Sequence, residues 1–257
     1  MFGKATSFIL ILCNVGLFCV HRPSIIPGEN AFDKLKGLGL VRKEKPFCLH
    51  LGCGQSHFNG YVNIDFPPSK HTAQTTVGAD VFADIVSLNF PDNSVDEIRS
   101  HHVFEHFDRQ TALALLCKWH KWLKIGGKLV IETPDFEASV KLFVGSQLSY
   151  SKKQAVLRHI FGSHEAGWAL HYDGWYEEKF FYVLSNLGFC DITFRKTKYL
   201  EIIKNIIVTS YKRKNLDFLS LSKKAKEILR DSLVSSKEKM MFNIWCDSFD
   251  KVFKNFF

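Results

Sequence analysis

The chain has 257 residues, of which 46% are hydrophobic, 14% aromatic and 23% charged. This balance is that of a globular protein, and it excludes a disordered chain, a collagen-like fibre and a coiled coil. The formal net charge of +8 permits a nucleic-acid or anionic-membrane partner without requiring one. The seven cysteines include no C-x-x-C pair, which argues against a disulfide framework and favours a reducing compartment.

The first 44 residues are predicted to be an apolar extension followed by a linker. The run from Phe8 to Val20 is shorter than the roughly 20 residues that a membrane-spanning helix needs, and no clean small-x-small cleavage site follows it. Three hypotheses stay open for residues 1–20: a packed helix, a helix on a membrane surface, and a signal or anchor segment. Proline and glycine punctuate residues 21–44, a composition typical of a linker.

From residue 47 onward, predicted strands and helices alternate. Asp108 is a suitable N-cap for a helix whose apolar residues continue to Leu123, and Gly126-Gly127 is expected to close it. Residues 141–176 contain no clean strand and are interpreted as an insertion. The alternation predicts an α/β domain with a largely parallel sheet covered on both faces. The expected strands cover 47–51, 61–65, 81–83, 95–100, 128–132, 192–199 and 203–212, the last two as an antiparallel pair, and further helices are expected over 177–187 and from 215 onward.

A glycine loop follows the first predicted strand. The run Gly52-Cys53-Gly54 precedes a strand that ends at Asp65, an arrangement typical of nucleotide binding because glycines admit the ligand and an acid accepts hydrogen bonds from ribose. A dinucleotide fingerprint is incomplete here, since His57 replaces the third glycine. A tight turn without a ligand is therefore the alternative at this stage.

Five sequence blocks in the same order resemble the class I S-adenosylmethionine-dependent methyltransferases. The blocks are LHLGCG, GYVNIDF, ADIVSLNFPDNSVDEI, HVFEHF and LKIGGKLVIETPD, and the resemblance covers about residues 45–212. It implies a doubly wound, mostly parallel sheet of seven strands with an antiparallel last strand, followed by C-terminal helices. It also implies S-adenosylmethionine as the cofactor.

The resemblance assigns roles to individual residues. In that family the G-x-G loop holds the methionine part of the cofactor, the acid ending the second strand binds the ribose, and the acid after the third strand reaches the adenine amino group. The cofactor-binding residues implied here are Gly52, Cys53, Gly54, Asp65, Asp84, Ile85 against the adenine ring, and His101 after the fourth strand.

Two departures from the family pattern are visible. Residues 55–60 leave room for barely one turn where the family usually has its first helix, so the glycine loop is expected to be less anchored. This shortening resembles a subgroup often met beside polysaccharide-biosynthesis genes. Ile125 replaces the family's proline in the L-K-P-G-G motif, which is expected only to soften that turn.

Two histidines are candidates for the general base that a hydroxyl or amine acceptor requires. His102 follows the fourth strand at the carboxyl edge of the sheet, where ligands bind in open α/β folds. The second candidate, His171, lies in the insertion among aromatic residues that suit a lid over a sugar-like acceptor. The alternatives are a histidine that only hydrogen-bonds its loop, and aromatics that only pack the insertion onto the domain.

A metal site is the competing interpretation of the same segment. Residues 102–106 spell H-x-x-E-H, in which two histidines on one helical face bind zinc and the glutamate acts as base. Such a zinc metallohydrolase requires the motif to lie within a helix and to gain a further ligand downstream. The hypothesis leaves the glycine loop, Asp65 and Asp84 unexplained, so no metal is expected in the site.

The sequence thus predicts a methyltransferase domain over 45–212 and a helical addition over 213–257. The expected reaction is O-methylation of a glycan or other small polar acceptor, with a cofactor-binding module that does not turn over as a further alternative. Nucleic acid is not an expected partner because no RNA-binding signature is present. A cytoplasmic protein is expected, and peripheral membrane contact is predicted through residues 1–20 and the basic C-terminal part.

Overall fold

The computed structural model describes residues 22–72, 76–145, 147–199 and 202–254. The hypotheses for residues 1–20 lie outside the described residues. Within the stretch predicted to be a linker, α1 (Ala31–Gly37) begins after an Asn30 cap that accepts a hydrogen bond from the Asp33 backbone. Ala31 and Leu35 are fully buried, and Ile25 N–H donates to the Phe82 carbonyl. This stretch therefore packs into the domain core, which differs from the linker interpretation.

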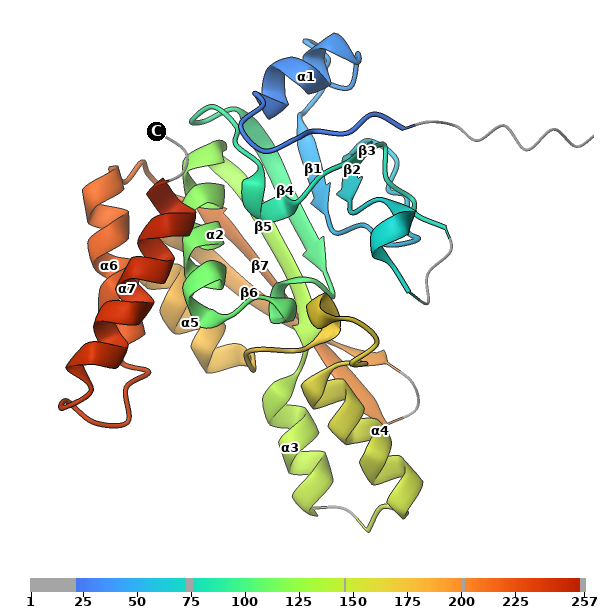
Figure 1. Ribbon diagram of the computed structural model, residues 1–257, viewed down its shortest axis with the longest axis vertical. Helices are drawn as coiled ribbons and strands as arrows, with labels where there is room; N and C mark the ends of the chain where they lie inside the picture. The colour runs from blue at the N-terminus through green and yellow to red at the C-terminus, as the bar shows by residue number, and fades with distance from the viewer. Residues whose placement is uncertain (1–21, 73–75, 146, 200–201, 255–257) are drawn as a thin grey trace, which may run out of the picture.

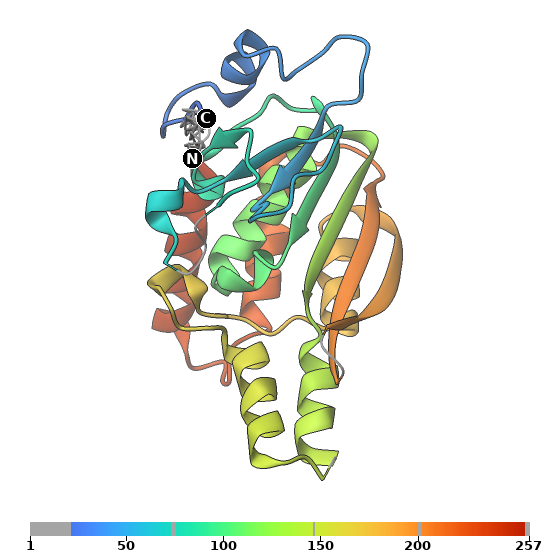
Figure 2. The same cartoon turned by 90° about the vertical axis from the view of Figure 1, so that its right-hand side faces the viewer.

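A seven-stranded sheet organises the domain, in the order β3-β2-β1-β4-β5-β7-β6 (Figures 1 and 2). The strands from β3 to β5 are parallel, whereas β7 runs antiparallel to both β5 and β6. This confirms the predicted sheet, including its antiparallel last strand. The strands are β1 (Cys48–Leu51), β2 (Val62–Asp65), β3 (Val81–Phe82), β4 (Val95–His101), β5 (Leu123–Pro134), β6 (Phe189–Tyr199) and β7 (Ile203–Lys212).

The central helix, α2 (Arg109–Trp122), begins at the predicted cap, since the Asp108 carboxylate accepts a hydrogen bond from the Thr111 backbone. Its Trp119 is fully buried. The helix ends at Trp122 and β5 starts directly at Leu123, so the expectation that Gly126-Gly127 closes the helix is wrong. The pairing of β4 with β5 is irregular between Val95 and Glu97, and β5 accommodates the glycines there.

The other helices are α3 (Phe136–Gly145), α4 (Tyr150–Phe161), α5 (Glu177–Asn186), α6 (Phe218–Arg230) and α7 (Lys239–Lys254).

The two faces of the sheet are covered differently. In Figure 1, α2, α5, α6 and α7 lie together on one side, with α6 and α7 forming an outer layer against α2. No helix follows β1, because residues 52–61 form turns instead. The opposite face carries Arg99, whose guanidinium lies 5.8 Å from the ring centre of Phe58 and 5.7 Å from that of Tyr61. Short connecting segments therefore cover this face in place of the missing first helix.

The segment interpreted as an insertion contributes the second half of α3 and all of α4 to a helical hairpin. Both views show α3 and α4 side by side, projecting away from the end of the sheet (Figures 1 and 2). The C-terminal addition is helical as predicted, and Phe249 and Phe253 are buried. Met241 and Ile244, on the same helix, are 45% and 52% exposed, so only part of its apolar residues pack. Among the described residues, no helix has the length and apolar character to cross a membrane.

Candidate active site

A cavity of about 830 Å³ opens where β1, β2 and β4 end. Ligands bind at this edge in open α/β sheets, because the carboxyl ends of parallel strands and the loops after them meet there. The cavity brings together every residue predicted to hold the cofactor, from four separate stretches of sequence. These lining residues are Gly52, Cys53, Gly54, Asp65, Asp84, Ile85 and His101.

The glycine loop crosses the cavity floor in a conformation that requires glycine at its first position. Gly52 has φ +71°, and a Cβ atom there would lie 2.1 Å from Cγ2 of Val103. The backbone N–H groups of Gly52 and Cys53 both donate to the Ile64 carbonyl, at 2.8 and 3.2 Å. The loop is therefore held between the end of β2 and the segment after β4.

Asp65 fixes the same loop from the end of β2. One carboxylate oxygen accepts a hydrogen bond from Gly54 N–H at 2.5 Å, and the other accepts one from Phe66 N–H at 2.6 Å. The side chain is buried, and this burial raises the pKa of Asp65 in spite of both backbone hydrogen bonds. His71 Nε2 lies 3.6 Å from the carboxylate. Asp65 is thus oriented at the cavity wall with its position set by the backbone.

Residues 77–80 support the glycine loop in place of the missing first helix. Gly78 N–H donates to the Gly54 carbonyl at 2.7 Å, and a Cβ at Gly78 would lie 2.9 Å from the Ser56 carbonyl carbon. Asp80 accepts hydrogen bonds from both the backbone and the side-chain amide of Asn63, at 2.8 and 2.9 Å. The expectation of a less anchored loop is therefore not met, because a distant segment provides the anchor.

The opposite wall of the cavity is formed after β3. Asp84 caps the short 3-10 helix Ile85–Ser87 by accepting a hydrogen bond from Val86 N–H at 2.9 Å. Ile85 is buried, whereas the Asp84 side chain is exposed. Behind this wall, Lys118 of α2 donates to the Val86 carbonyl at 2.8 Å, and burial lowers the pKa of Lys118 to about 6. An apolar side chain and an acid therefore stand side by side at the cavity rim.

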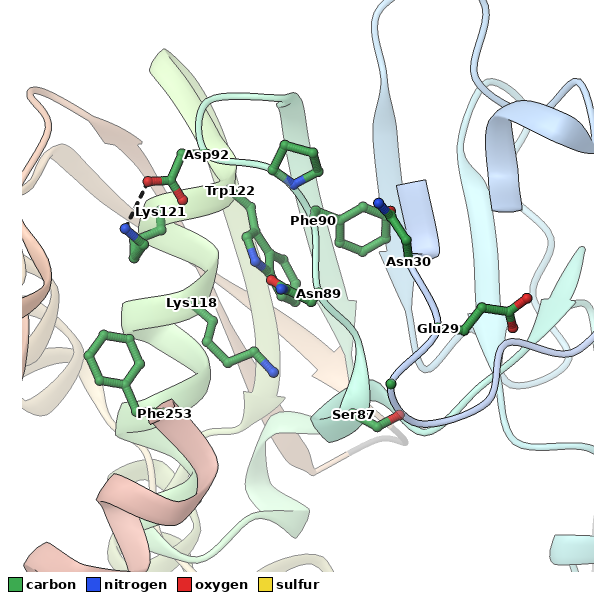
Figure 3. Close-up of a pocket in the computed structure, with 12 residues that line it drawn as sticks. Glu29, Asn30, Ser87, Asn89, Phe90, Asp92, Lys118, Lys121, Trp122 and Phe253 are labelled. Atoms are coloured by element: carbon green, nitrogen blue, oxygen red, sulfur yellow. Dashed lines mark hydrogen bonds and ion pairs between the residues drawn. The ribbon is translucent and has the colours of Figure 1, made fainter. Parts of the chain in front are cut away.

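Lys118 also borders a separate cavity of about 460 Å³ between α2 and the segment that leads to α1 (Figure 3). Trp122 and Phe253 contribute apolar walls there, and Lys121 forms an ion pair with Asp92 at 2.7 Å. None of the residues predicted for the site lines this cavity. It is therefore distinct from the site at the strand ends.

His102 occupies the turn after β4 in a left-handed conformation, with φ +52°. Its Nδ1 lies 3.3 Å from a carboxylate oxygen of Glu105, and its Nε2 lies 2.8 Å from the side-chain nitrogen of Asn205. Burial opposes a charge on this ring, but the hydrogen bond and charge of Glu105 and the charge of Glu132 raise the pKa of His102 overall. Both ring nitrogens are thus engaged within the protein, which leaves the role of His102 as a base a prediction.

The structure does not place the H-x-x-E-H motif in a helix. Only Phe104–His106 is helical, as a single 3-10 turn, and His102 stands before it with positive φ. His102 and His106 therefore do not share a helical face as the zinc hypothesis requires. The structure instead brings Glu105 and His106 together with His171, whose potential ligand atoms all lie within 4.8 Å of one another.

A further cavity of about 340 Å³ adjoins the cavity at the strand ends. We call the cavity at the strand ends the first cavity and this smaller one the second cavity. His102 and His106 line both cavities, and His171 lines only the second. Trp168, on the same loop as His171, lines the first cavity and donates from its indole nitrogen to the Lys70 carbonyl at 2.9 Å. The insertion thus reaches both cavities, as the prediction of a lid requires.

Several residues of the site were not predicted. His50 and Glu132 line the first cavity from within β1 and β5, and Asn205 of β7 joins His102 to Glu132. His50 and Glu132 each lie inside or beside a block of the methyltransferase resemblance, which offered a signal for them. No local pattern marks Asn205, because its place in the site depends on the packing of distant segments.

Comparison with known proteins agrees with this geometry. Residues 49–131 match a family model described as a methyltransferase domain. They span β1 to β5 and include the glycine loop, Asp65 and Asp84. Residues 49–131 are therefore similar to a methyltransferase domain, which supports the resemblance to class I methyltransferases drawn from the sequence and S-adenosylmethionine as the cofactor. A comparison with curated protein sequences found no match.

Solved structures give more distant likenesses. A Haemonchus contortus phosphoethanolamine N-methyltransferase 2 in complex with S-adenosyl-L-methionine is 14% identical over 73% of this chain and 54% of its own, with a TM-score of 0.44. This chain thus spans about half the length of that enzyme. A S-adenosylmethionine-dependent methyltransferase from Methanosarcina mazei is 14% identical over 69% of this chain and 97% of its own, with a TM-score of 0.42.

Proposed function

We propose that this protein transfers the methyl group of S-adenosylmethionine to a hydroxyl group of a small polar acceptor, such as a sugar unit of a glycan or of its lipid-linked precursor. The observation that carries the proposal is the shared wall between two cavities. One cavity contains the cofactor residues predicted from the methyltransferase pattern, and the other presents imidazole and carboxylate groups. A group-transfer enzyme needs two such sites in contact.

The chemistry of the reaction fits this arrangement. An oxygen lone pair of the acceptor attacks the methyl carbon in line with the bond to sulfur, and the electrons of that bond return to sulfur as the sulfonium becomes a neutral thioether. The acceptor hydroxyl loses its proton towards the histidine-lined wall or to water. The protein mainly has to hold both partners in line, and orientation of this kind can supply roughly 7–11 kcal/mol of the barrier.

The second cavity suits a small hydroxylated acceptor. Its volume of about 340 Å³ lies at the lower end of ligand pockets, which are roughly 300–1,000 Å³. Arg158 and Ser163 add donors to the imidazole and carboxylate groups of its wall. Polar groups that converge in one cavity select ligands able to hydrogen-bond with them, because an apolar ligand would leave those groups unpaired. A single sugar ring matches both the size and the polarity.

The cofactor site is tested by titration calorimetry with S-adenosylhomocysteine, the product that lacks the transferred methyl group. The wild-type chain should bind it, and Asp65→Ala should bind it about 10–150-fold more weakly, because hydrogen bonds to a charged group contribute about 1.5–3 kcal/mol. Asp92→Ala removes an exposed acid paired with Lys121 and serves as the matched control. Equal affinity of all three proteins would show that the ribose site is misplaced.

Turnover is tested separately with methyl-labelled S-adenosylmethionine and a panel of monosaccharides, glycans and lipid-linked sugars. Transfer of label to a hydroxyl of one class would identify the acceptor. Binding of S-adenosylhomocysteine without transfer to any acceptor would favour the alternative of a cofactor-binding module that does not turn over. His102→Gln and His171→Gln, assayed on the same acceptor, separate the two candidate bases.

A further inference from the structure

We propose that Glu105, His106 and His171 bind a divalent metal ion of the zinc type at the boundary between the two cavities. Two imidazoles and one carboxylate are a ligand set found in catalytic zinc sites. The three side chains come from the 3-10 turn after β4 and from the insertion loop, 65 residues further along the chain. Binding of the ion itself does not depend on the proposed methyl transfer, but its role in acceptor activation rests on it.

Both histidines are held in the tautomer that a metal ion requires. Nδ1 of His106 donates to the Leu170 carbonyl at 3.0 Å, and Nδ1 of His171 donates to the His159 carbonyl at 3.1 Å. A carbonyl can only accept a hydrogen bond, so Nδ1 carries the proton on each ring and Nε2 carries the lone pair. Metal-bound histidines commonly have this outer partner, which fixes the ring and its tautomer.

Glu105 supplies the negative charge. It is 2% exposed, and apart from the interaction with His102 neither of its carboxylate oxygens has a hydrogen-bond partner among the described residues. One oxygen lies 3.3 Å from His102 Nδ1 and 4.0 Å from His171 Nε2. A carboxylate buried in this way is costly unless a cation or strong donors compensate it. A metal ion beside the two imidazoles would provide that compensation.

The cluster is close to the size that an ion needs. The three potential ligand atoms lie within 4.8 Å of one another. Ligands placed tetrahedrally about 2.1 Å from zinc are roughly 3.4 Å apart, so the widest pair would close by about 1.4 Å on binding. All three residues line the second cavity and His106 also lines the first. The remaining coordination position would therefore face the place proposed for the acceptor.

An ion at this point would help to activate the acceptor in the proposed reaction. A bound cation polarises an oxygen ligand and lowers its pKa, so the acceptor hydroxyl could release its proton to water before its oxygen attacks the methyl carbon. In this arrangement His171 is a ligand and not the base. Glu105 and His106 likewise position the acceptor through the ion, and they need not contact the cofactor.

The test is metal titration of the full chain after it has been stripped with a chelator. Cobalt(II) is followed by visible absorption and zinc by calorimetry, both without S-adenosylmethionine. The wild-type chain should bind one ion, and its cobalt(II) form should show the visible absorption bands of an ion with low coordination number. Glu105→Gln and His171→Gln should each lower the affinity for the ion. The loss should exceed the roughly 10–100-fold that is seen when a hydrogen-bond partner of a metal ligand is removed. His164→Gln changes an exposed histidine of the same loop outside the cluster and should bind like the wild type.

Thermal unfolding and S-adenosylhomocysteine titration of each variant show whether it has folded, and His106→Gln replaces any variant that has not. No binding by the wild-type chain, or equal binding by the wild type and the folded ligand variants, would overturn the metal site. Failure of S-adenosylhomocysteine to bind a metal-binding wild type would instead count only against the proposed function. The two proposals are therefore tested independently.

Discussion

The two cavities at the carboxyl edge of the sheet are built in different ways. The larger one is formed mostly by strand ends and the loops directly after them, and the glycine loop and Asp65 are 11 positions apart. The smaller one combines the turn after β4, the end of β5, α4 and the insertion loop. The first can be located from local patterns once the strand order is known, whereas the second exists only after distant segments have packed.

This difference suggests a division of tasks. The strand-end cavity is part of the scaffold, because its residues also make backbone hydrogen bonds that hold the sheet edge together. Residues that the insertion contributes to the second cavity are held in part by other residues of the insertion, as His171 is by the His159 carbonyl of α4. Loops on a rigid scaffold can change without loss of the fold. Acceptor choice is therefore expected to depend on the insertion.

The largest effect is expected at the residue that joins the two regions. Phe104 is fully buried, and its ring centre lies 4.8 Å from that of Trp175 at the end of the insertion and 5.5 Å from that of Trp119 in α2. Phe104→Ala should lower the free energy of unfolding by about 3–5 kcal/mol, since it leaves a cavity in the core. Urea denaturation measures this change. Phe181→Ala is the control, because that side chain is 56% exposed, and a similar loss in both variants would contradict the prediction.

A smaller effect is expected where the glycine loop meets the turn after β4. Gly52→Ala must adopt positive φ and also clash with Val103, whereas Gly28→Ala has positive φ and open space around its Cβ. The Gly28 variant should lose only about 1–2 kcal/mol of stability. The Gly52 variant should lose about 1–3 kcal/mol more, the usual range for overpacking, and should bind S-adenosylhomocysteine less well. Equal losses of stability in the two variants would mean that Val103 can move away from residue 52 at little cost.

The third effect concerns the scaffold behind both cavities. His120 of α2 lines neither cavity and is fully buried, and this burial lowers its pKa to about 3. The unfolded chain protonates this ring near pH 6.5, so stability should fall below that pH and continue to fall towards pH 3. The contribution of His120 is at most about 1.4 kcal/mol per pH unit. Above pH 6.5 this residue should cause no pH dependence.

Urea unfolding of the wild type and His120→Gln between pH 7 and pH 4 measures this slope. The variant should show a shallower slope, and His164→Gln, which alters an exposed ring, should keep the slope of the wild type. If all three proteins lose stability in parallel, the acid sensitivity comes from groups other than His120.

The sequence was sufficient to predict a mostly parallel sheet of seven strands and the residues that line the strand-end cavity, because both depend on strand ends and short loops. It was not sufficient for α1, since a seven-residue helix that ends at Gly37 forms too short a pattern to be distinguished from a linker. The zinc hypothesis also assumed that His102 and His106 of the H-x-x-E-H motif share one helical face, which they do not. The left-handed backbone at His102 breaks the helical periodicity that the motif assumes, and only the fold shows that His171 takes its place beside Glu105 and His106.

The hydrogen bond from Trp168 to the Lys70 carbonyl has a consequence for the order of events during turnover. The loop that carries His171 also contributes Trp168 to the wall of the cavity proposed for the cofactor, so we expect an acceptor held by this loop to hinder entry of the cofactor. Steady-state kinetics should then follow a compulsory order, with S-adenosylmethionine binding first and S-adenosylhomocysteine leaving last. Product inhibition by S-adenosylhomocysteine would accordingly be competitive towards S-adenosylmethionine and noncompetitive towards the acceptor.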